Sequence, residues 1–281
     1  MLKSFVIAGS LILAGPAAAQ STGRTSPAAE AGVAEQRQAI AQTVERGRQL
    51  FALSRAGALA TQDMLSRVPN AEATGVSGWI AEPQGNAMVV TFYADTAEGP
   101  VAAYRGTVLG GRVTARDLYP ADSRPPLMST AKRMAAARAA TDALDNRVCA
   151  SDQPFNVLVV PPANADAPIH VYQLTPMLER TAAPLGGHYR TTVNADGSVA
   201  QRETFGGATC QVLQVPPAAE GRAARALEIT EAGLSLPNEI HVLTSLMTGR
   251  PLVVRTGSDI WGVTGEGIGE LRQRRSPAVG R

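Results

Sequence analysis

The sequence contains few of the residue types that mark nucleic-acid-binding, redox or metal-binding proteins. It has two cysteines, three histidines and only two lysines, and aromatic residues make up 4% of the chain. Its formal net charge is +2 over 281 residues. Because a nucleic-acid-binding protein needs a concentrated basic surface, we expect no nucleic-acid partner. After the N-terminal segment no apolar run approaches the roughly 18 residues that mark a membrane-spanning helix, so we expect no membrane anchor in the mature chain.

Signatures of common enzyme families are also missing. The chain has no G-x-S-x-G, H-E-x-x-H, G-x-G-x-x-G or G-x-x-x-x-G-K motif, the patterns that present a nucleophile, bind zinc or cradle phosphates. The three histidines, His170, His188 and His241, are each predicted to lie on a strand, and their spacing matches no zinc signature. We therefore assign no catalytic residue, no cofactor and no metal site from the sequence.

The first nineteen residues have the three parts of a secretory signal peptide. Lys3 supplies the positive charge, Phe5–Ala14 is an apolar run, and Ala17-Ala18-Ala19 offers the small residues that signal peptidase recognises. The apolar run is too short to cross a hydrocarbon core, which needs about 20 residues. We therefore expect residues 1–19 to be a signal peptide, cleaved after Ala19, and the mature protein to be periplasmic.

Both cysteines, Cys149 and Cys210, lie in the part of the chain that is expected to be exported. In an oxidising compartment an even pair most simply forms one disulfide. The alternatives are a reactive thiol or a metal ligand. A redox centre usually shows C-x-x-C and a zinc cluster needs more ligands nearby, and neither pattern surrounds these cysteines. We predict a Cys149–Cys210 disulfide that ties the end of a helix to a strand.

Residues 34–120 are predicted to form a helix followed by a β-meander. Residues 20–33 are small and polar and indicate a disordered linker. Apolar residues spaced by three, four and seven predict a helix over 34–68. A break near Gly47 or Gly57 would be consistent with the cost of about 1 kcal/mol for glycine in a helix interior. Alternating β-favouring residues predict strands at 88–94, 101–109 and 112–119, with Gly110-Gly111 as a hairpin turn.

Residues 121–271 are predicted to form an alanine-rich helix and several strands. The helix is expected over 127–148, and a short helix is possible over 220–231. The expected strands are 155–160, 169–175, 188–193, 199–205, 239–246, 252–256 and 260–264. Residues 272–281 indicate a disordered basic tail. Short strands joined by tight turns predict an α+β fold, in which antiparallel β-meander sheets are packed by a long N-terminal helix and the alanine-rich helix.

One motif suggests catalysis, the sequence Ser129-Thr130-Ala131-Lys132. It resembles the S-x-x-K nucleophile motif of penicillin-binding proteins and serine β-lactamases, and one helical turn would place Ser129 beside Lys132. The other elements of those families are altered, because Ser151-Asp152-Gln153 replaces S-D-N and Arg255-Thr256-Gly257 replaces K-T-G. A neutral lysine is needed to accept the hydroxyl proton. The helical pattern directs Lys132 to solvent, where it stays charged, so we predict that the pair is not catalytic.

Three stretches of the C-terminal half resemble an uncharacterised family of exported Gram-negative bacterial proteins. They are Cys149–Val160, Gly186–Arg190 with the hairpin that follows it to Cys210, and Pro237–Val263. The resemblance implies export and a shared fold, and it implies no activity. We therefore expect a soluble periplasmic protein that is not an enzyme and that binds an unidentified ligand or envelope protein, or supports the cell envelope. The alternative is a serine–lysine acyl-transfer enzyme of the penicillin-binding or β-lactamase type that uses Ser129 and Lys132.

Overall fold

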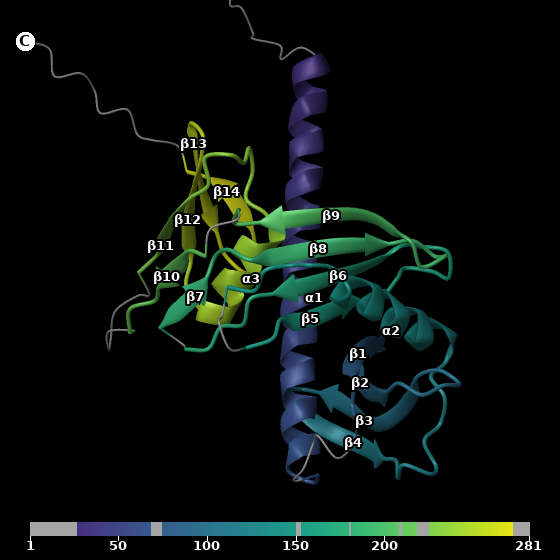
Figure 1. Cartoon of the computed structure of the whole chain (residues 1–281). Coiled ribbons are helices and arrows are strands. Elements are labelled where there is room, and N and C mark those ends of the chain that lie inside the picture. The colour runs from purple at the N-terminus through teal and green to yellow at the C-terminus, as the bar shows by residue number, and fades with distance from the viewer. Residues whose placement is uncertain are drawn as a thin grey trace, which may run out of the picture. The chain divides into compact units, whose positions relative to one another are not determined.

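The computed structural model describes residues 27–68, 75–149, 153–179, 181–207, 210–217 and 225–271. The expected signal peptide and the basic tail lie outside these residues. Within them, three helices and fourteen strands form the α+β fold that the sequence predicts (Figure 1). Met1–Gln38 is one unit and Ala39–Arg281 is a second, compact unit, to which the packing described below belongs.

Helix α1 (Pro27–Leu65) begins earlier than the sequence analysis expects. Residues 27–33, which were assigned to a disordered linker, form its first turns. Proline suits the first helical position because its fixed φ matches the helix and its missing N–H would have no partner there. Alanine and glutamate, which follow, are good helix formers. The linker prediction was therefore wrong for residues 27–33.

Two glycines in α1 are explained by close packing, and the helix runs unbroken through both. A Cβ atom at Gly47 would lie 2.5 Å from the Cβ of Val242 in α3 (Glu239–Thr248). A Cβ atom at Gly57 would lie 2.6 Å from the ring of Trp79 in β1 (Gly78–Gln84). Each glycine lets another element approach the helix axis, and this contact offsets its propensity cost of about 1 kcal/mol.

The first sheet is an antiparallel meander in the order β1-β2-β3-β4. It consists of β1, β2 (Ala87–Ala94), β3 (Val101–Leu109) and β4 (Arg112–Leu118). Strands β2 to β4 match the predicted ranges within a residue at each end, because both their alternation and the Gly110-Gly111 turn are local signals. Strand β1 was missed, since its sequence contains a proline and polar residues at its end.

The second sheet has the antiparallel order β5-β6-β8-β9. Its strands are β5 (Asn156–Val160), β6 (Ile169–Leu174), β8 (His188–Val193) and β9 (Val199–Phe205). Helix α2 (Ser129–Asp142) packs on this sheet and on β1 (Figure 1). Its Met134 and several of its alanines are buried.

Helix α2 ends at Asp142, six residues before the predicted end at Val148. The Gln173 side chain of β6 donates to the carbonyl of Thr141 and to the carboxylate of Asp142. Beyond it, the Asn146 side chain donates to Gln173, and the carbonyl of Arg147 accepts from the Tyr189 hydroxyl. These contacts with the sheet hold residues 143–148 out of the helix.

A third sheet contains a parallel pair that the sequence did not predict. Its order is β11-β12-β13-β14, formed by β11 (Leu227–Thr230), β12 (Leu252–Thr256), β13 (Asp259–Val263) and β14 (Ile268–Glu270). Strand β11 lies parallel to β12, and α3 forms the crossover between them. The possible helix over 220–231 is therefore wrong for residues 227–230. Strands β7 (Ala182–Pro184) and β10 (Val212–Gln214) form a separate antiparallel pair.

Residues 239–246 form helix α3, and the strand predicted there is wrong. The Asn238 side chain accepts from the backbone N–H groups of Ile240 and His241, while the His241 ring accepts from the Asn238 N–H. This reciprocal capping satisfies amide groups that a helix start otherwise leaves unpaired. Gly249 ends the helix in the left-handed conformation, with φ of 65°.

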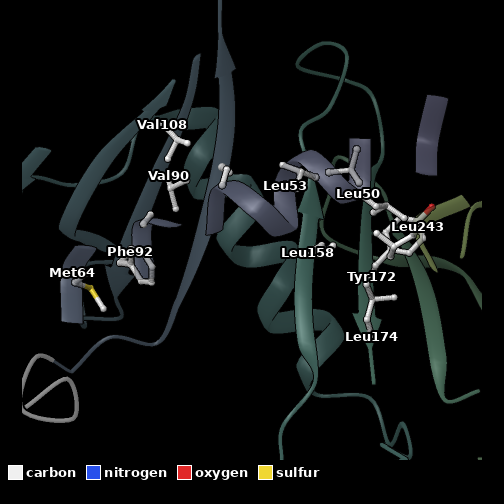
Figure 2. Close-up of a cluster of buried hydrophobic side chains, with 14 of the residues drawn as sticks. Leu50, Leu53, Met64, Val90, Phe92, Val108, Leu158, Tyr172, Leu174 and Leu243 are labelled. Atoms are coloured by element: carbon white, nitrogen blue, oxygen red, sulfur yellow. The ribbon is translucent and has the colours of Figure 1, made fainter. Parts of the chain in front are cut away.

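A single apolar cluster joins the two segments that the sequence separates at residue 120 (Figure 2). Its fully buried side chains come from α1, both four-stranded antiparallel sheets and α3, and include Leu50, Val90, Leu158, Tyr172 and Leu243. Complete burial of one leucine side chain stabilises a fold by roughly 1.5–3 kcal/mol. The segments 34–120 and 121–271 therefore share a core, and an isolated antiparallel β-bridge between Val101 and Pro126 also joins them. None of the described helices is both long and apolar enough to cross a membrane.

Candidate functional site

The Ser129–Lys132 pair lies on the exposed side of α2. Ser129 is the first residue of the helix, and both side chains are exposed. Because Lys132 is exposed, the pair lacks the desolvated amine that an acyl-transfer nucleophile needs. Arg255–Gly257 lies at the end of β12, whereas α2 packs on β1 and the second sheet. Ser151 and Asp152 lie outside the described residues.

The three histidines occupy three different structural settings. His170 on β6 is half-buried, and its Nδ1 is 3.1 Å from the hydroxyl of Thr192. Burial, and then the positive charges of Arg190 and Arg46, lower the pKa of His170. His241 lies in α3 and not on a strand, so that prediction was wrong. No cluster of three metal-binding side chains occurs in the part of the chain that the structure describes.

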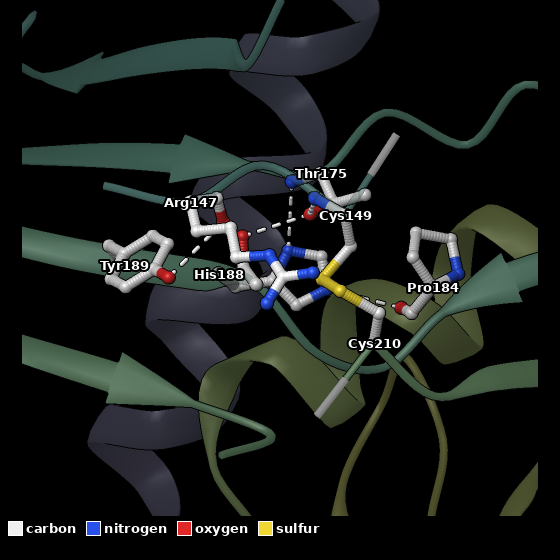
Figure 3. Close-up of a disulfide and its surroundings, with 8 residues drawn as sticks. Arg147, Cys149, Thr175, Pro184, His188, Tyr189 and Cys210 are labelled. Atoms are coloured by element: carbon white, nitrogen blue, oxygen red, sulfur yellow. Dashed lines mark hydrogen bonds between the residues drawn. A yellow bond between two sulfur atoms is a disulfide. The ribbon is translucent and has the colours of Figure 1, made fainter. Parts of the chain in front are cut away.

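Cys149 and Cys210 are joined in a disulfide, with their Cα atoms 5.3 Å apart (Figure 3). Cys149 is half-buried and follows the residues that leave α2, while Cys210 is exposed just before β10. The backbone N–H of Cys149 donates to the Thr175 hydroxyl, which donates to the carbonyl of Gly187. The disulfide and these bonds together connect four separate stretches of the chain.

His188 is the buried centre of this network (Figure 3). Its Nδ1 accepts from the backbone N–H of Thr175 at 3.2 Å, and its Nε2 donates to the carbonyl of Pro184 at 3.1 Å. Burial lowers the pKa of His188, the Pro184 carbonyl opposes this effect, and the nearby His241 lowers the pKa further. His188 is therefore a neutral, fully hydrogen-bonded imidazole and has no free nitrogen for catalysis or for a metal.

An apolar cleft opens beside this network, where the chain leaves β6 and passes α3. It has two parts that share Thr175, Pro176 and Pro184. One is a partly open cavity of about 40 Å³, and the other is a wider depression of about 250 Å³ next to Cys149. The cavity has room for a few water molecules or for the tip of one side chain. We define the apolar cleft by its exposed or half-buried apolar residues, which are Pro176, Met177, Leu178, Pro184, Val212 and Met247.

Three large apolar side chains of this cleft are exposed to solvent. The exposed fractions are 60% for Leu178, 53% for Val212 and 41% for Met247. Single exposed apolar residues are common, but several around two adjoining hollows are typical of a binding surface. Glu179 at the edge of the depression adds one negative charge. The cleft can therefore accept an apolar group, with a positive charge beside it.

Beneath the N-terminus of α3 lies an enclosed cluster of charged residues. The Glu239 carboxylate accepts from the Tyr172 hydroxyl at 2.8 Å and from the Arg190 guanidinium at 2.5 Å, and Arg46 of α1 lies 3.6 Å away. Burial, and then the charge of Glu239, raise the pKa of Tyr172, which keeps the hydroxyl protonated as a donor. The side chains of Glu239 and Arg190 are 6% and 14% exposed. We assign this cluster the role of fixing α3, one wall of the cleft, against the second sheet.

No protein-family model, curated protein or solved structure shows significant similarity to the chain. The resemblance to an exported bacterial family therefore stays a prediction. The apolar cleft is the feature of the described residues that indicates a function.

Sequence reasoning missed every residue of the cleft. The stretch Pro176-Met177-Leu178-Glu179, which places apolar residues directly after a predicted strand, could have been noticed as an exposed apolar turn. The contribution of Met247 could not have been predicted. It lies about 70 residues further along the chain, and residues 239–246 just before it were expected to form a strand.

Proposed function

We propose that the chain is an exported periplasmic protein that binds an apolar segment of an envelope protein in the apolar cleft. The signal-like residues 1–19 support export, and a disulfide is typical of an oxidising compartment. The observation that carries the binding proposal is that Leu178 and Val212 line the depression and Met247 lines the cavity that adjoins it at Pro176 and Pro184, all three side chains being exposed.

The dimensions and composition of the cleft favour a protein segment over a cofactor. The cavity, at about 40 Å³, admits the end of one side chain. Two methionines line it, and their unbranched side chains adapt to differently shaped apolar groups. Because Glu179 is negatively charged, it favours a partner segment in which a basic residue lies beside the apolar residue that enters the cleft. The alternative serine–lysine acyl transferase gains no support, since Ser129 and Lys132 are exposed.

Export has a direct test. We expect the protein recovered from the periplasmic fraction of cells that express the full chain to begin at Gln20, because signal peptidase cleaves after small residues such as Ala17 and Ala19. N-terminal sequencing measures this. Uncleaved protein confined to the cytoplasm would contradict the proposal of export.

Binding in the cleft is tested with a dansyl-labelled peptide of sequence Arg-Leu-Phe-Leu. We expect Met247→Glu to weaken binding at least about tenfold, because it places a charge where an apolar side chain should be desolvated. Fluorescence anisotropy measures the affinity. The matched control is Met128→Glu, since Met128 is 74% exposed at the start of α2 and contributes nothing to the cleft.

Two outcomes would overturn the binding proposal. One is failure of the unmodified protein to bind the peptide at concentrations up to 1 mM (about −4 kcal/mol). The other is an unchanged affinity in both Met247→Glu and Leu178→Glu, with circular dichroism showing that both variants are folded.

A further inference from the structure

Arg250 is a buried cation that has no acidic partner among the described residues. It directly follows Gly249, the residue that ends α3, and is 7% exposed. Its Nη2 donates to the carbonyl of Pro216 at 2.6 Å. Its backbone carbonyl accepts from the Ser245 hydroxyl at 2.7 Å. Among the described residues, no carboxylate lies within ion-pair distance of its guanidinium.

Such an arrangement leaves the charge of Arg250 only partly compensated. Arginine stays protonated at every physiological pH and carries five N–H donors. One backbone carbonyl and the negative end of the α3 dipole offset part of the desolvation cost. Buried guanidinium groups are otherwise paired with an anion, because an uncompensated charge away from water is costly. An anion bound beside Arg250 would therefore compensate its charge.

Arg250 lines an open groove of about 620 Å³ at the C-terminal end of α3. Arg48 of α1 stands in the same groove, and its Nε and Nη2 donate to the carbonyls of Gly265 and Glu266 at 2.7 and 3.2 Å. These two bonds hold the Arg48 guanidinium in place. Phe51 and Leu246 supply an apolar wall. Two arginines and an aromatic residue thus line one hollow.

We propose that this groove binds a monocarboxylate that carries an apolar group, with Arg250 and Arg48 bonding the carboxylate. Guanidinium groups match the planar oxyanion, and charge-assisted hydrogen bonds are about twice as strong as neutral ones. Phe51 and Leu246 contact the apolar part. The Glu266 carboxylate at the border of the groove disfavours a dianion such as a phosphate monoester. The proposal does not depend on the apolar cleft, which has different lining residues.

Isothermal titration calorimetry with 4-phenylbutyrate tests this site. We expect the unmodified protein to bind 4-phenylbutyrate at least about tenfold more tightly than 4-phenylbutanol, phenyl phosphate or inorganic phosphate. Arg250→Met should weaken 4-phenylbutyrate binding at least about tenfold, and Arg48→Met should weaken it as well. Arg255→Met is the matched control and should leave binding unchanged, because Arg255 is 45% exposed on β12 and 3.8 Å from Glu228.

The urea midpoint of Arg250→Met separates a binding role from a structural one. If Arg250 is an uncompensated charge, its replacement by an apolar residue of similar length leaves the midpoint unchanged or raises it. A lower midpoint together with undiminished 4-phenylbutyrate binding would overturn the proposal. So would equal binding of the alcohol, or an absence of binding by the unmodified protein. If Arg250→Met does not fold, the 4-phenylbutyrate affinity of Arg48→Met tests the site instead. Arg48 is exposed, so we expect that variant to fold.

Discussion

Arg190→Met should lower the free energy of unfolding by about 3–5 kcal/mol, one of the two largest effects that we expect for this protein. The change removes the closest cation from Glu239, whose side chain is 6% exposed. Arg46, at 3.6 Å and 35% exposed, is then the remaining positive charge beside it. Arg190 also ion-pairs with Glu203 and lies against the rings of Tyr172 and Phe205, so packing is lost too. Urea denaturation followed by circular dichroism measures the loss.

A double variant shows whether the loss of stability comes from the unpaired Glu239 carboxylate or from the lost packing of Arg190. Arg190→Met with Glu239→Leu replaces the buried pair by apolar residues, which is often neutral or stabilising, so it should recover most of the loss. The control, Arg255→Met, breaks a surface pair at 3.8 Å and should change stability by no more than about 0.5 kcal/mol. A double variant as unstable as Arg190→Met alone would show that the charge of Glu239 is not the cause.

Removal of the disulfide by Cys149→Ser with Cys210→Ser should destabilise the protein by about 4 kcal/mol. The bridge spans 61 residues of sequence, and closing so long a loop reduces the conformational entropy of the unfolded chain. The loss is larger if Thr175 and His188 also loosen, because the Cys149 N–H donates to the Thr175 hydroxyl. Urea denaturation of the variant, compared with the unmodified protein, measures the effect.

Two controls accompany the disulfide experiment. The unmodified protein in excess dithiothreitol should match the double serine variant, since both lack the bridge. Thiol titration of the unfolded, unreduced protein should detect no free cysteine. Two titratable thiols, or equal stability with and without the bridge, would contradict the prediction.

Local features of this fold were predictable from the sequence. The hairpin at Gly110-Gly111 depends on residues close in the chain, and the strands beside it lie at their predicted positions. The pairing of Cys149 with Cys210 follows from there being only two cysteines. The exposure of Lys132 follows from its angle to the apolar stripe of α2.

Other features depend on contacts between distant parts of the chain. The alternation of Ile240 and Val242 indicated a strand, but the side chains of Asn238 and His241 cap a helix there. Strand β11 exists because it pairs with β12, more than twenty residues later, and no local pattern reports such a partner. Gly47 and Gly57, which suggested a break in α1, are instead the points where Val242 and Trp79 pack on it.

The sequence by itself determined the α+β class, the disulfide, most of the antiparallel strands and the exposure of Ser129 and Lys132, because each depends on local periodicity or on composition. Only the tertiary structure decided the two proposed binding surfaces. The apolar cleft combines residues after β6 with Met247 of α3, and the groove combines Arg48 with Arg250, about 200 residues away. Such a site depends on which distant residues lie next to one another on the protein surface. The packing of the whole core determines those neighbours.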